Sequence, residues 1–236
     1  MPDSFAELRH ELAVANRILA NEGIIDAFGH ISARNPRDPS RYFISRHRAS
    51  ELVEPSDILE MTLDSKPVVP TNVRLYSEMV IHGEIYKARP DVHSVVHCHT
   101  PALVTFCVCQ TPLRPLYHMS GFLGRGVARF EIREVAGMTD MLCSTPQLGA
   151  ALAKSLADKQ IVLMRGHGAT MAGHSIKHSV FRALYAALNA TMQMDAMRLG
   201  EVTYLADEEA MKGMEINDRF VDRSWSLWKH EAMGPS

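Results

Sequence analysis

The stretch Val92-His93-Ser94-Val95-Val96-His97-Cys98 is the part of this sequence that decides its fold. Its apolar run predicts a strand buried inside a sheet, because a strand covered on both faces needs no polar alternation. Upstream, 77–88 predicts a helix that ends at Arg89-Pro90, since the residue before a proline disfavours helical geometry. Downstream, a helix at 147–157 precedes the short apolar strand Ile161–Met164. Helices that alternate with buried strands indicate an α/β protein.

The remaining segments surround these strands. A helix is expected from Ser4 to Asn21, where Ser4 and Glu7 have the spacing of a capping box. Further helices are expected at 101–110 and 174–199, and an amphipathic tail follows at 207–233 with Trp225 and Trp228. Short alternating segments between turn residues predict antiparallel strands at His30–Arg34, Arg41–Ser45 and Ile58–Leu63.

This order of elements predicts one domain over residues 1–236. We expect a three-layer α/β/α sandwich around a largely antiparallel central sheet. We also expect the tail, about 207–236, to pack at a subunit interface, with Trp225 and Trp228 contributing to that contact rather than to a pocket.

Composition excludes several classes of function. A net charge of -2 without a basic patch argues against nucleic-acid binding. No apolar run reaches the roughly 18 residues of a membrane span, and Met1-Pro2-Asp3-Ser4 leads into a polar helix rather than a signal peptide. Four cysteines lie in apolar contexts without a C-x-x-C pair, so we expect buried free thiols in a cytoplasmic protein: Cys98, Cys107, Cys109 and Cys143.

Histidines at the ends of two predicted strands are the strongest sign of chemistry. His97 and His99 are two residues apart, so on a strand both imidazoles point to one face and can share a metal ion. The alternative is a pair of polar strand caps. His167 stands between Gly166 and Gly168, which let the backbone approach a ligand closely or take a positive φ. A plain tight turn is the alternative there.

Glu78 and His82 complete this set. Glu78 is expected in the first turn of its helix, where the helix dipole favours a carboxylate, and His82 follows one turn later. The alternative is a capping Glu and an exposed His. Three imidazoles and a carboxylate suit a catalytic Zn²⁺, Mn²⁺ or Fe²⁺ ion. We predict one divalent ion per subunit on His97, His99, His167 and Glu78, with Glu78 and His82 as catalytic acid/base residues.

The sequence resembles the class II aldolase/adducin family over roughly residues 5–205. The segments that carry the resemblance are Gly29-His30-Ile31-Ser32-Ala33-Arg34, Tyr42-Phe43-Ile44-Ser45, Tyr76-Ser77-Glu78, Arg89-Pro90-Asp91-Val92 through His99, and Gly166-His167-Gly168-Ala169. The resemblance implies that the three histidines hold the metal and that Glu78 is the acid/base residue, which also binds the metal when no substrate is present. It further implies a homotetramer with active sites at subunit interfaces.

Departures from the sugar-phosphate members concern the substrate. Those members resemble Gly-Asn-x-Ser, Ser/Thr-x-x-Gly and Ser-Ser-Glu at the loops that cradle a phosphate. Here the same places hold Gly29-His30-Ile31-Ser32, Ser45-Arg46-His47-Arg48 and Tyr76-Ser77-Glu78. Arginine forks suit a planar carboxylate and tyrosine suits an aromatic ring. A solvated loop is the alternative for the two arginines.

This variant pattern, with 74–86 and 117–122, resembles the subgroup that decarboxylates hydroxylated aromatic dicarboxylates. Dihydroxyphthalate decarboxylase and 3-hydroxy-2-methylpyridine-4,5-dicarboxylate decarboxylase are its members. The resemblance implies a small acidic substrate held by Ser45, Arg46, Arg48, Arg74, Ser77 and His118. For His118, a structural loop residue is the alternative.

We therefore predict a metal-dependent carbon–carbon lyase that decarboxylates a hydroxylated aromatic or pyridine dicarboxylate. The ring hydroxyl and the neighbouring carboxylate would chelate the ion, and the ring carbon would be protonated by Glu78 or through His82. The alternatives are an aldolase or 4-epimerase acting on a sugar phosphate, a non-enzymatic adducin-like scaffold, and an iron-dependent oxygenase on the same fold.

Overall fold

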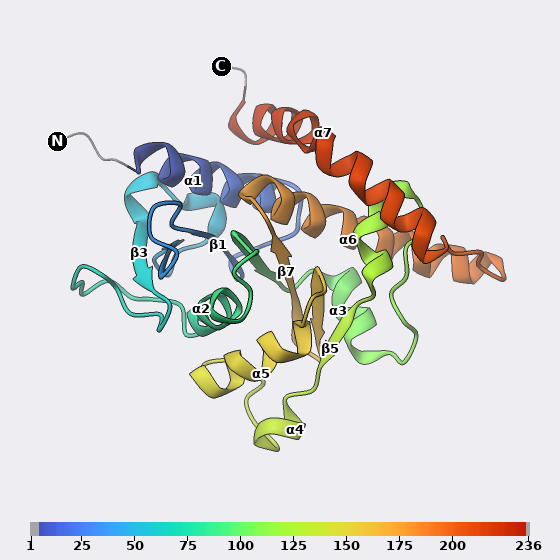
Figure 1. Cartoon of the computed structure of the whole chain (residues 1–236), viewed down its shortest axis with the longest axis horizontal. Coiled ribbons are helices and arrows are strands. Elements are labelled where there is room, and N and C mark those ends of the chain that lie inside the picture. The colour runs from blue at the N-terminus through green and yellow to red at the C-terminus, as the bar shows by residue number, and fades with distance from the viewer. Residues whose placement is uncertain (1–4, 235–236) are drawn as a thin grey trace.

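A seven-stranded sheet forms the middle of the computed structural model, which describes residues 5–234 (Figure 1). The strand order is β3-β2-β1-β4-β7-β6-β5, and every neighbouring pair is antiparallel except β5 and β6. The prediction of a largely antiparallel sheet is confirmed. The strands are β1 (His30–Arg34), β2 (Arg41–Ser45), β3 (Ile58–Thr62), β4 (Ser94–Cys98), β5 (Ala128–Phe130), β6 (Ile161–Met164) and β7 (Gly168–Gly173).

Helices cover both faces of this sheet and complete the predicted three layers (Figure 1). Successive strand residues point to opposite faces, so Val96 belongs to the core under α1, α3 and α6, whereas Val95 belongs to the core under α2 and α5. The α-helices are α1 (Ala6–Asn21), α2 (Met79–Ala88), α3 (Pro101–Val108), α4 (Arg133–Ala136), α5 (Pro146–Leu156), α6 (Ile176–Leu199) and α7 (Asp207–Met233). Short 3-10 helices are η1 (Ser50–Leu52), η2 (Pro55–Asp57) and η3 (His118–Arg125).

Two strands were missing from the prediction, and one predicted helix cap falls outside the described residues. The central strand β7 was not predicted, because its small residues (Gly168-Ala169-Thr170-Met171-Ala172-Gly173) show neither alternation nor a β-branched run. The short strand β5 was missed as well. The proposed capping box at Ser4 lies outside the described residues, within which α1 begins at Ala6.

The C-terminal helix α7 packs over α1, α6 and η3 (Figure 1). Trp225 and Trp228, expected at a subunit contact, are buried within the chain, and Trp228 lies 6.3 Å from Phe181 between ring centroids. Their burial follows from the apolar face that α7 turns toward α6. The outer face of α7 instead exposes Phe220 and Leu227, with 62% and 55% of each residue accessible.

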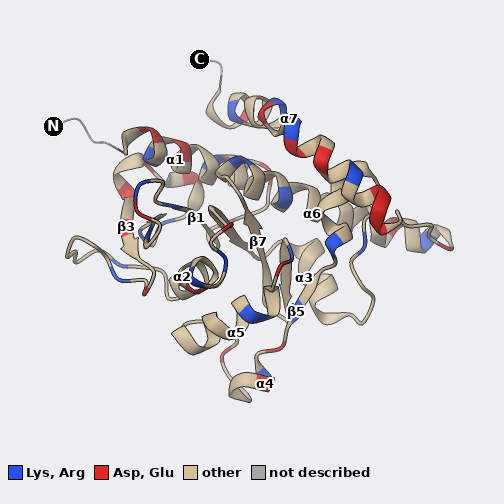
Figure 2. Cartoon of the chain, in the orientation of Figure 1, with Lys and Arg blue, Asp and Glu red and all other residues tan. Residues whose placement is uncertain are grey.

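The positions of the charged residues and cysteines agree with the expectations drawn from composition, except at Cys109. Acidic and basic residues are mixed over the surface helices, including α7 (Figure 2). Among the described residues, no helix is long and apolar enough to cross a membrane. Cys98, Cys107 and Cys143 are buried free thiols, but Cys109 is exposed because α3 ends just before it.

Candidate metal centre

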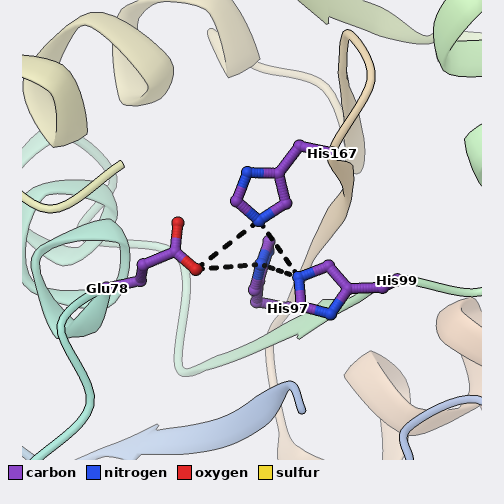
Figure 3. Close-up of side chains that lie close together, drawn as sticks. All are labelled: Glu78, His97, His99 and His167. Atoms are coloured by element: carbon purple, nitrogen blue, oxygen red, sulfur yellow. Dashed lines mark hydrogen bonds and ion pairs between the residues drawn. The ribbon is translucent and has the colours of Figure 1, made fainter. Parts of the chain in front are cut away.

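Four side chains from three segments of the chain converge beside the end of the central strand β4 (Figure 3). His97 is in β4 and His99 follows that strand, while His167 occupies the turn between β6 and β7. The antiparallel pairing of β4 with β7 sets Cys98 opposite Ala169, so the turn that carries His167 returns beside the end of β4. Glu78 directly precedes α2 and does not cap its own helix, which leaves its carboxylate free to point at the histidines.

The donor atoms lie at the separations that one small cation requires. His99 Nε2 is 3.1 Å from His97 Nε2 and 3.0 Å from His167 Nε2. Glu78 Oε2 is 3.8 Å from His97 Nε2 and 3.5 Å from His167 Nε2. Ligands at the usual Zn–N distance around a tetrahedral ion are about 3.3 Å apart. The donor set, three imidazole nitrogens and a carboxylate oxygen, therefore fits a divalent ion.

Both glycines around His167 have the backbone role that the sequence suggested. Gly166 has φ +64°, a conformation that L side chains rarely adopt. At Gly168 an added Cβ would overlap the carbonyl of Cys98. The turn therefore approaches the end of β4 only because these two positions lack side chains.

Partners outside the cluster orient three of the four donor residues, which are His97, His167 and Glu78. His167 Nδ1–H donates to the Met141 carbonyl at 2.8 Å, so the Nε2 lone pair of this imidazole points inward. His97 Nδ1 lies 3.0 Å from Thr170 Oγ1, which orients the second ring in the same way. Glu78 Oε1 accepts the Cys143 backbone N–H at 2.8 Å, so the other carboxylate oxygen turns to the histidines. None of these partners was identified from the sequence, because 141–143 carries no local pattern.

Electrostatics favour a cation in this cluster. Burial lowers the pKa of His97 and of His99, which keeps both imidazoles neutral and able to bind a metal. Burial alone would raise the pKa of Glu78, but the nearby His167 and His97 imidazoles outweigh it and bring the pKa to about 2. Burial opposes protonation of His167, yet the Glu78 carboxylate raises the pKa of that imidazole. The carboxylate thus attracts positive charge to the centre.

A pocket of about 270 Å³ opens beside the cluster and contains two of the predicted substrate contacts, Arg74 and Ser77. Arg74 is exposed, and among the described residues its guanidinium has no carboxylate partner. The other walls include Phe28, His30, His47 and Tyr76. An apolar ring surface and an unpaired cation therefore face the cluster together.

Comparison with known proteins assigns the chain to a family. Residues 10–194 match the Class II Aldolase and Adducin N-terminal domain. The chain belongs to the class II aldolase/adducin family.

Similar proteins within this family include decarboxylases. The chain is 37% identical to Decarboxylase tropJ of Talaromyces stipitatus, over 91% of this chain and 90% of that protein. It is 27% identical to 3,4-dihydroxyphthalate decarboxylase of Arthrobacter keyseri, over 98% and 94%. An aldolase II superfamily protein from Pseudomonas syringae has the same fold, with a TM-score of 0.80 at 23% identity over 98% and 94%. These relatives match the predicted subgroup and support a lyase.

The other predicted contacts lie outside the pocket of this class II aldolase-type chain. Arg46 Nε and Arg48 Nη1 each lie 2.6 Å from an oxygen of Asp57, so this one carboxylate holds both guanidinium groups at the base of the β2–β3 loop. Ser45 is buried and its Oγ lies 3.2 Å from the Tyr76 hydroxyl, so it supports the pocket wall. His118 is exposed in η3, and its carbonyl accepts a hydrogen bond from α7.

His82 lies behind the pocket rather than in it. The side chain is fully buried, and its Nε2 is 2.6 Å from His30 Nδ1, so His30 stands between His82 and the cluster. Burial lowers the pKa of His82 to about 3, which makes it a neutral imidazole. His30 and His47, which line the pocket, were not predicted; the first was noticed only as a departure from Asn.

Proposed function

We propose that this chain is a metal-dependent decarboxylase of a hydroxylated aromatic or pyridine dicarboxylate. The observation that carries the proposal is the cluster of three imidazoles and Glu78, which opens on a pocket whose rim holds the unpaired Arg74. An anionic substrate with a ring matches this pairing of cation and aromatic wall. The decarboxylase names of the relatives support the same reaction.

We propose that His97, His99 and His167, with Glu78, hold one Zn²⁺, Mn²⁺ or Fe²⁺ ion. The donor separations, the inward lone pairs and the carboxylate charge support this. When bound, the ion supplies a Lewis acid that polarises a substrate oxygen and stabilises developing negative charge.

Arg74, Ser77 and Tyr76, which line the pocket, orient the substrate. Arg74 binds the carboxylate that is retained, through its two-pronged guanidinium, and Ser77 offers a hydroxyl beside it. Tyr76 is fixed as a wall for the ring, because its hydroxyl donates to the Arg48 carbonyl at 2.6 Å. Holding the ring at two points sets the carbon that loses CO₂ near Glu78.

Glu78 moves the proton. Its low pKa means that it enters the reaction as a carboxylate, so it first takes the proton of the ring hydroxyl. It then delivers that proton to the ring carbon that bears the departing carboxylate. The bond from this carbon to the carboxylate breaks, its electron pair returns to the ring, and CO₂ leaves. A proton from solvent restores the phenol, so one proton is consumed overall.

We further propose a cytoplasmic homotetramer in which the pocket is completed at a subunit interface. Phe28 is 66% exposed at the pocket mouth although it is apolar, as expected if another subunit covers it. The exposed Phe220 and Leu227 on α7 offer a further apolar contact surface.

A turnover screen tests the reaction. Zn²⁺-, Mn²⁺- and Fe²⁺-loaded protein is incubated with hydroxylated benzene and pyridine dicarboxylates and, in parallel, with phosphorylated ketoses, while CO₂ release, aldehyde formation and oxygen consumption are followed. We expect CO₂ release from a dicarboxylate that bears a hydroxyl next to a carboxyl. Cleavage or epimerisation of a ketose phosphate alone, or turnover that consumes oxygen, would overturn the proposal.

A further inference from the structure

A buried chain of hydrogen bonds runs from the interior to the pocket wall. Tyr86 Oη lies 2.7 Å from Ser32 Oγ, and Ser32 Oγ lies 2.6 Å from His82 Nδ1. His82 Nε2 lies 2.6 Å from His30 Nδ1. The four side chains belong to β1 and α2, and none is more than 3% exposed. So many short contacts in a dry interior hold one arrangement of protons.

The far end of the chain sets the direction of the bonds. Among the described residues, Ser32 Oγ is the only hydrogen-bond partner of the buried Tyr86 hydroxyl, so it is the acceptor for the phenol proton. Burial raises the pKa of Tyr86 far above its usual range, which keeps that proton in place. Ser32 therefore donates its own proton to His82 Nδ1. His82 Nε2–H donates in turn to His30 Nδ1.

His30 must then carry its proton on Nε2. This nitrogen has no hydrogen-bond partner among the described residues, and it is not among the unpaired atoms sealed from solvent. His30 lines the pocket beside the metal cluster. A nearly buried side chain thus offers an N–H donor to the pocket without a protein acceptor.

We propose that His30 is a substrate-binding residue that donates its Nε2–H to an anionic oxygen of the substrate, and that His82, Ser32 and Tyr86 are positioning residues that hold this tautomer. The identity of the oxygen, a carboxylate or phenolate, rests on the proposed function. Because Nδ1 already accepts from His82, His30 has no lone pair for the pocket. It selects acceptors and does not serve as a base.

The tautomer is measurable without any substrate. Protein labelled with ¹⁵N-histidine and loaded with Zn²⁺ is studied by long-range ¹H–¹⁵N NMR, with the His30 signals assigned by their loss in His30→Leu. We expect a protonated Nε2 and an unprotonated Nδ1. A proton on Nδ1 would overturn the inference. Because this readout needs no turnover, failure of the decarboxylase assignment leaves it intact.

The positioning chain has a matched pair of variants. Tyr86→Phe removes the first donor, so the Ser32 hydroxyl can turn and His30 samples both tautomers. Tyr42 is equally buried, and its ring stacks on His82, but its hydroxyl bonds to Ser65 and is not part of the hydrogen-bond chain. Tyr42→Phe removes only this hydroxyl. We expect mixed His30 signals in Tyr86→Phe and the wild-type tautomer in Tyr42→Phe. Identical spectra in the two variants would contradict the positioning role.

Binding of phthalate tests the donor itself. Phthalate supplies two carboxylates but no ring hydroxyl, so its affinity for the Zn²⁺-loaded protein is measured by calorimetry in the absence of turnover. Loss of a hydrogen bond to a charged group in His30→Leu should weaken binding by about tenfold or more. Tyr86→Phe should weaken it by a smaller factor and Tyr42→Phe should leave it unchanged. Unaltered affinity in His30→Leu that retains the wild-type Tm would overturn the proposal.

Discussion

Among the described residues, two clusters combine imidazoles with a carboxylate, and they differ in how their ring nitrogens are oriented. The first is the cage of Glu78, His97, His99 and His167. The second is made of His174, His178 and Asp218, at the start of α6 and on the facing side of α7. In the cage the outer ring nitrogens of His97 and His167 bond outward, so their Nε2 atoms face the centre.

In the second cluster, His178 already uses both of its ring nitrogens. His178 Nδ1 lies 2.7 Å from Ser175 Oγ, and His178 Nε2–H donates to the Asp218 carbonyl at 3.3 Å. The buried Arg182 guanidinium lies 3.8 Å from the Asp218 carboxylate and opposes a second cation. Residue types alone therefore do not make a metal site, because the partners outside the cluster decide which ligand atoms are available.

The largest expected effect separates the two clusters by metal content. His167→Ala should reduce the Zn²⁺ retained after desalting to well below one ion per chain, because it removes one of the three imidazole ligands and leaves only two. Elemental analysis after reconstitution and desalting measures this.

The double variant His174→Ala with His178→Ala is the matched control and should retain its full metal content. Loss of one equivalent from the double variant, with His167→Ala unchanged, would reverse the comparison.

Glu78→Gln tests which member of the cage does chemistry. The amide keeps the size of the side chain but cannot accept and deliver a proton, so kcat should fall by about 10²- to 10⁴-fold while the metal remains bound. Steady-state kinetics and metal analysis on the same sample check both parts. A fully active Gln variant would remove Glu78 from the proposed mechanism.

Thr170→Val tests the importance of the outer partners. It removes the hydroxyl that orients His97 while it preserves the shape of the strand, and Zn²⁺ affinity should fall by about 10- to 100-fold. Competition with a chelator gives the affinity. Ser175→Ala, which removes the corresponding hydroxyl beside His178, serves as the control and should leave Zn²⁺ affinity unchanged.

Replacing Arg74, which lines the pocket, and Arg48, which lies outside it, should affect KM differently. Arg74 is unpaired at the pocket, so Arg74→Ala should raise KM for the dicarboxylate by about tenfold through the loss of a charge-assisted hydrogen bond. Arg48 is paired with Asp57, and Arg48→Ala should leave KM within a few-fold of wild type. Equal effects on KM would place Arg48 at the substrate after all.

The smallest effect concerns pH and the second cluster. Burial, with the charges of His178 and Arg182, lowers the pKa of His174 to about 4. The unfolded imidazole binds its proton first as the pH falls below about 6.5, so this group's contribution to stability is lost between about pH 6.5 and 4. His174→Asn should flatten the decline of Tm across that window. An unchanged decline would show that His174 does not titrate in this way.

Local patterns in the sequence identified the four side chains that meet in the cage, whereas contacts between distant segments were invisible. His97-Cys98-His99 at a strand end and His167 between glycines are readable within a few residues. Met141 and Cys143, which orient His167 and Glu78, come from a loop without any periodic pattern.

The arginines show the same limit on prediction. Arg46 and Arg48 looked as available as Arg74, since nothing in the local sequence reveals that both bind Asp57. The strand β7 was not predicted, because a strand buried on both faces between two neighbours can be built largely from small residues.

The close approach of Gly168 to β4 means that the strands holding the cluster tolerate few substitutions, whereas the loops around the pocket tolerate more. The positions of the cage histidines depend on the pairing of β4 with β7 and on Gly168, where any side chain would collide with the backbone of β4. The pocket rim instead comes from loops that carry Phe28, His47 and Arg74. Loops can be exchanged without shifting strand register. An engineer, or evolution, can therefore redirect this scaffold to another substrate by changing the loops around the pocket while the cluster of Glu78, His97, His99 and His167 is retained.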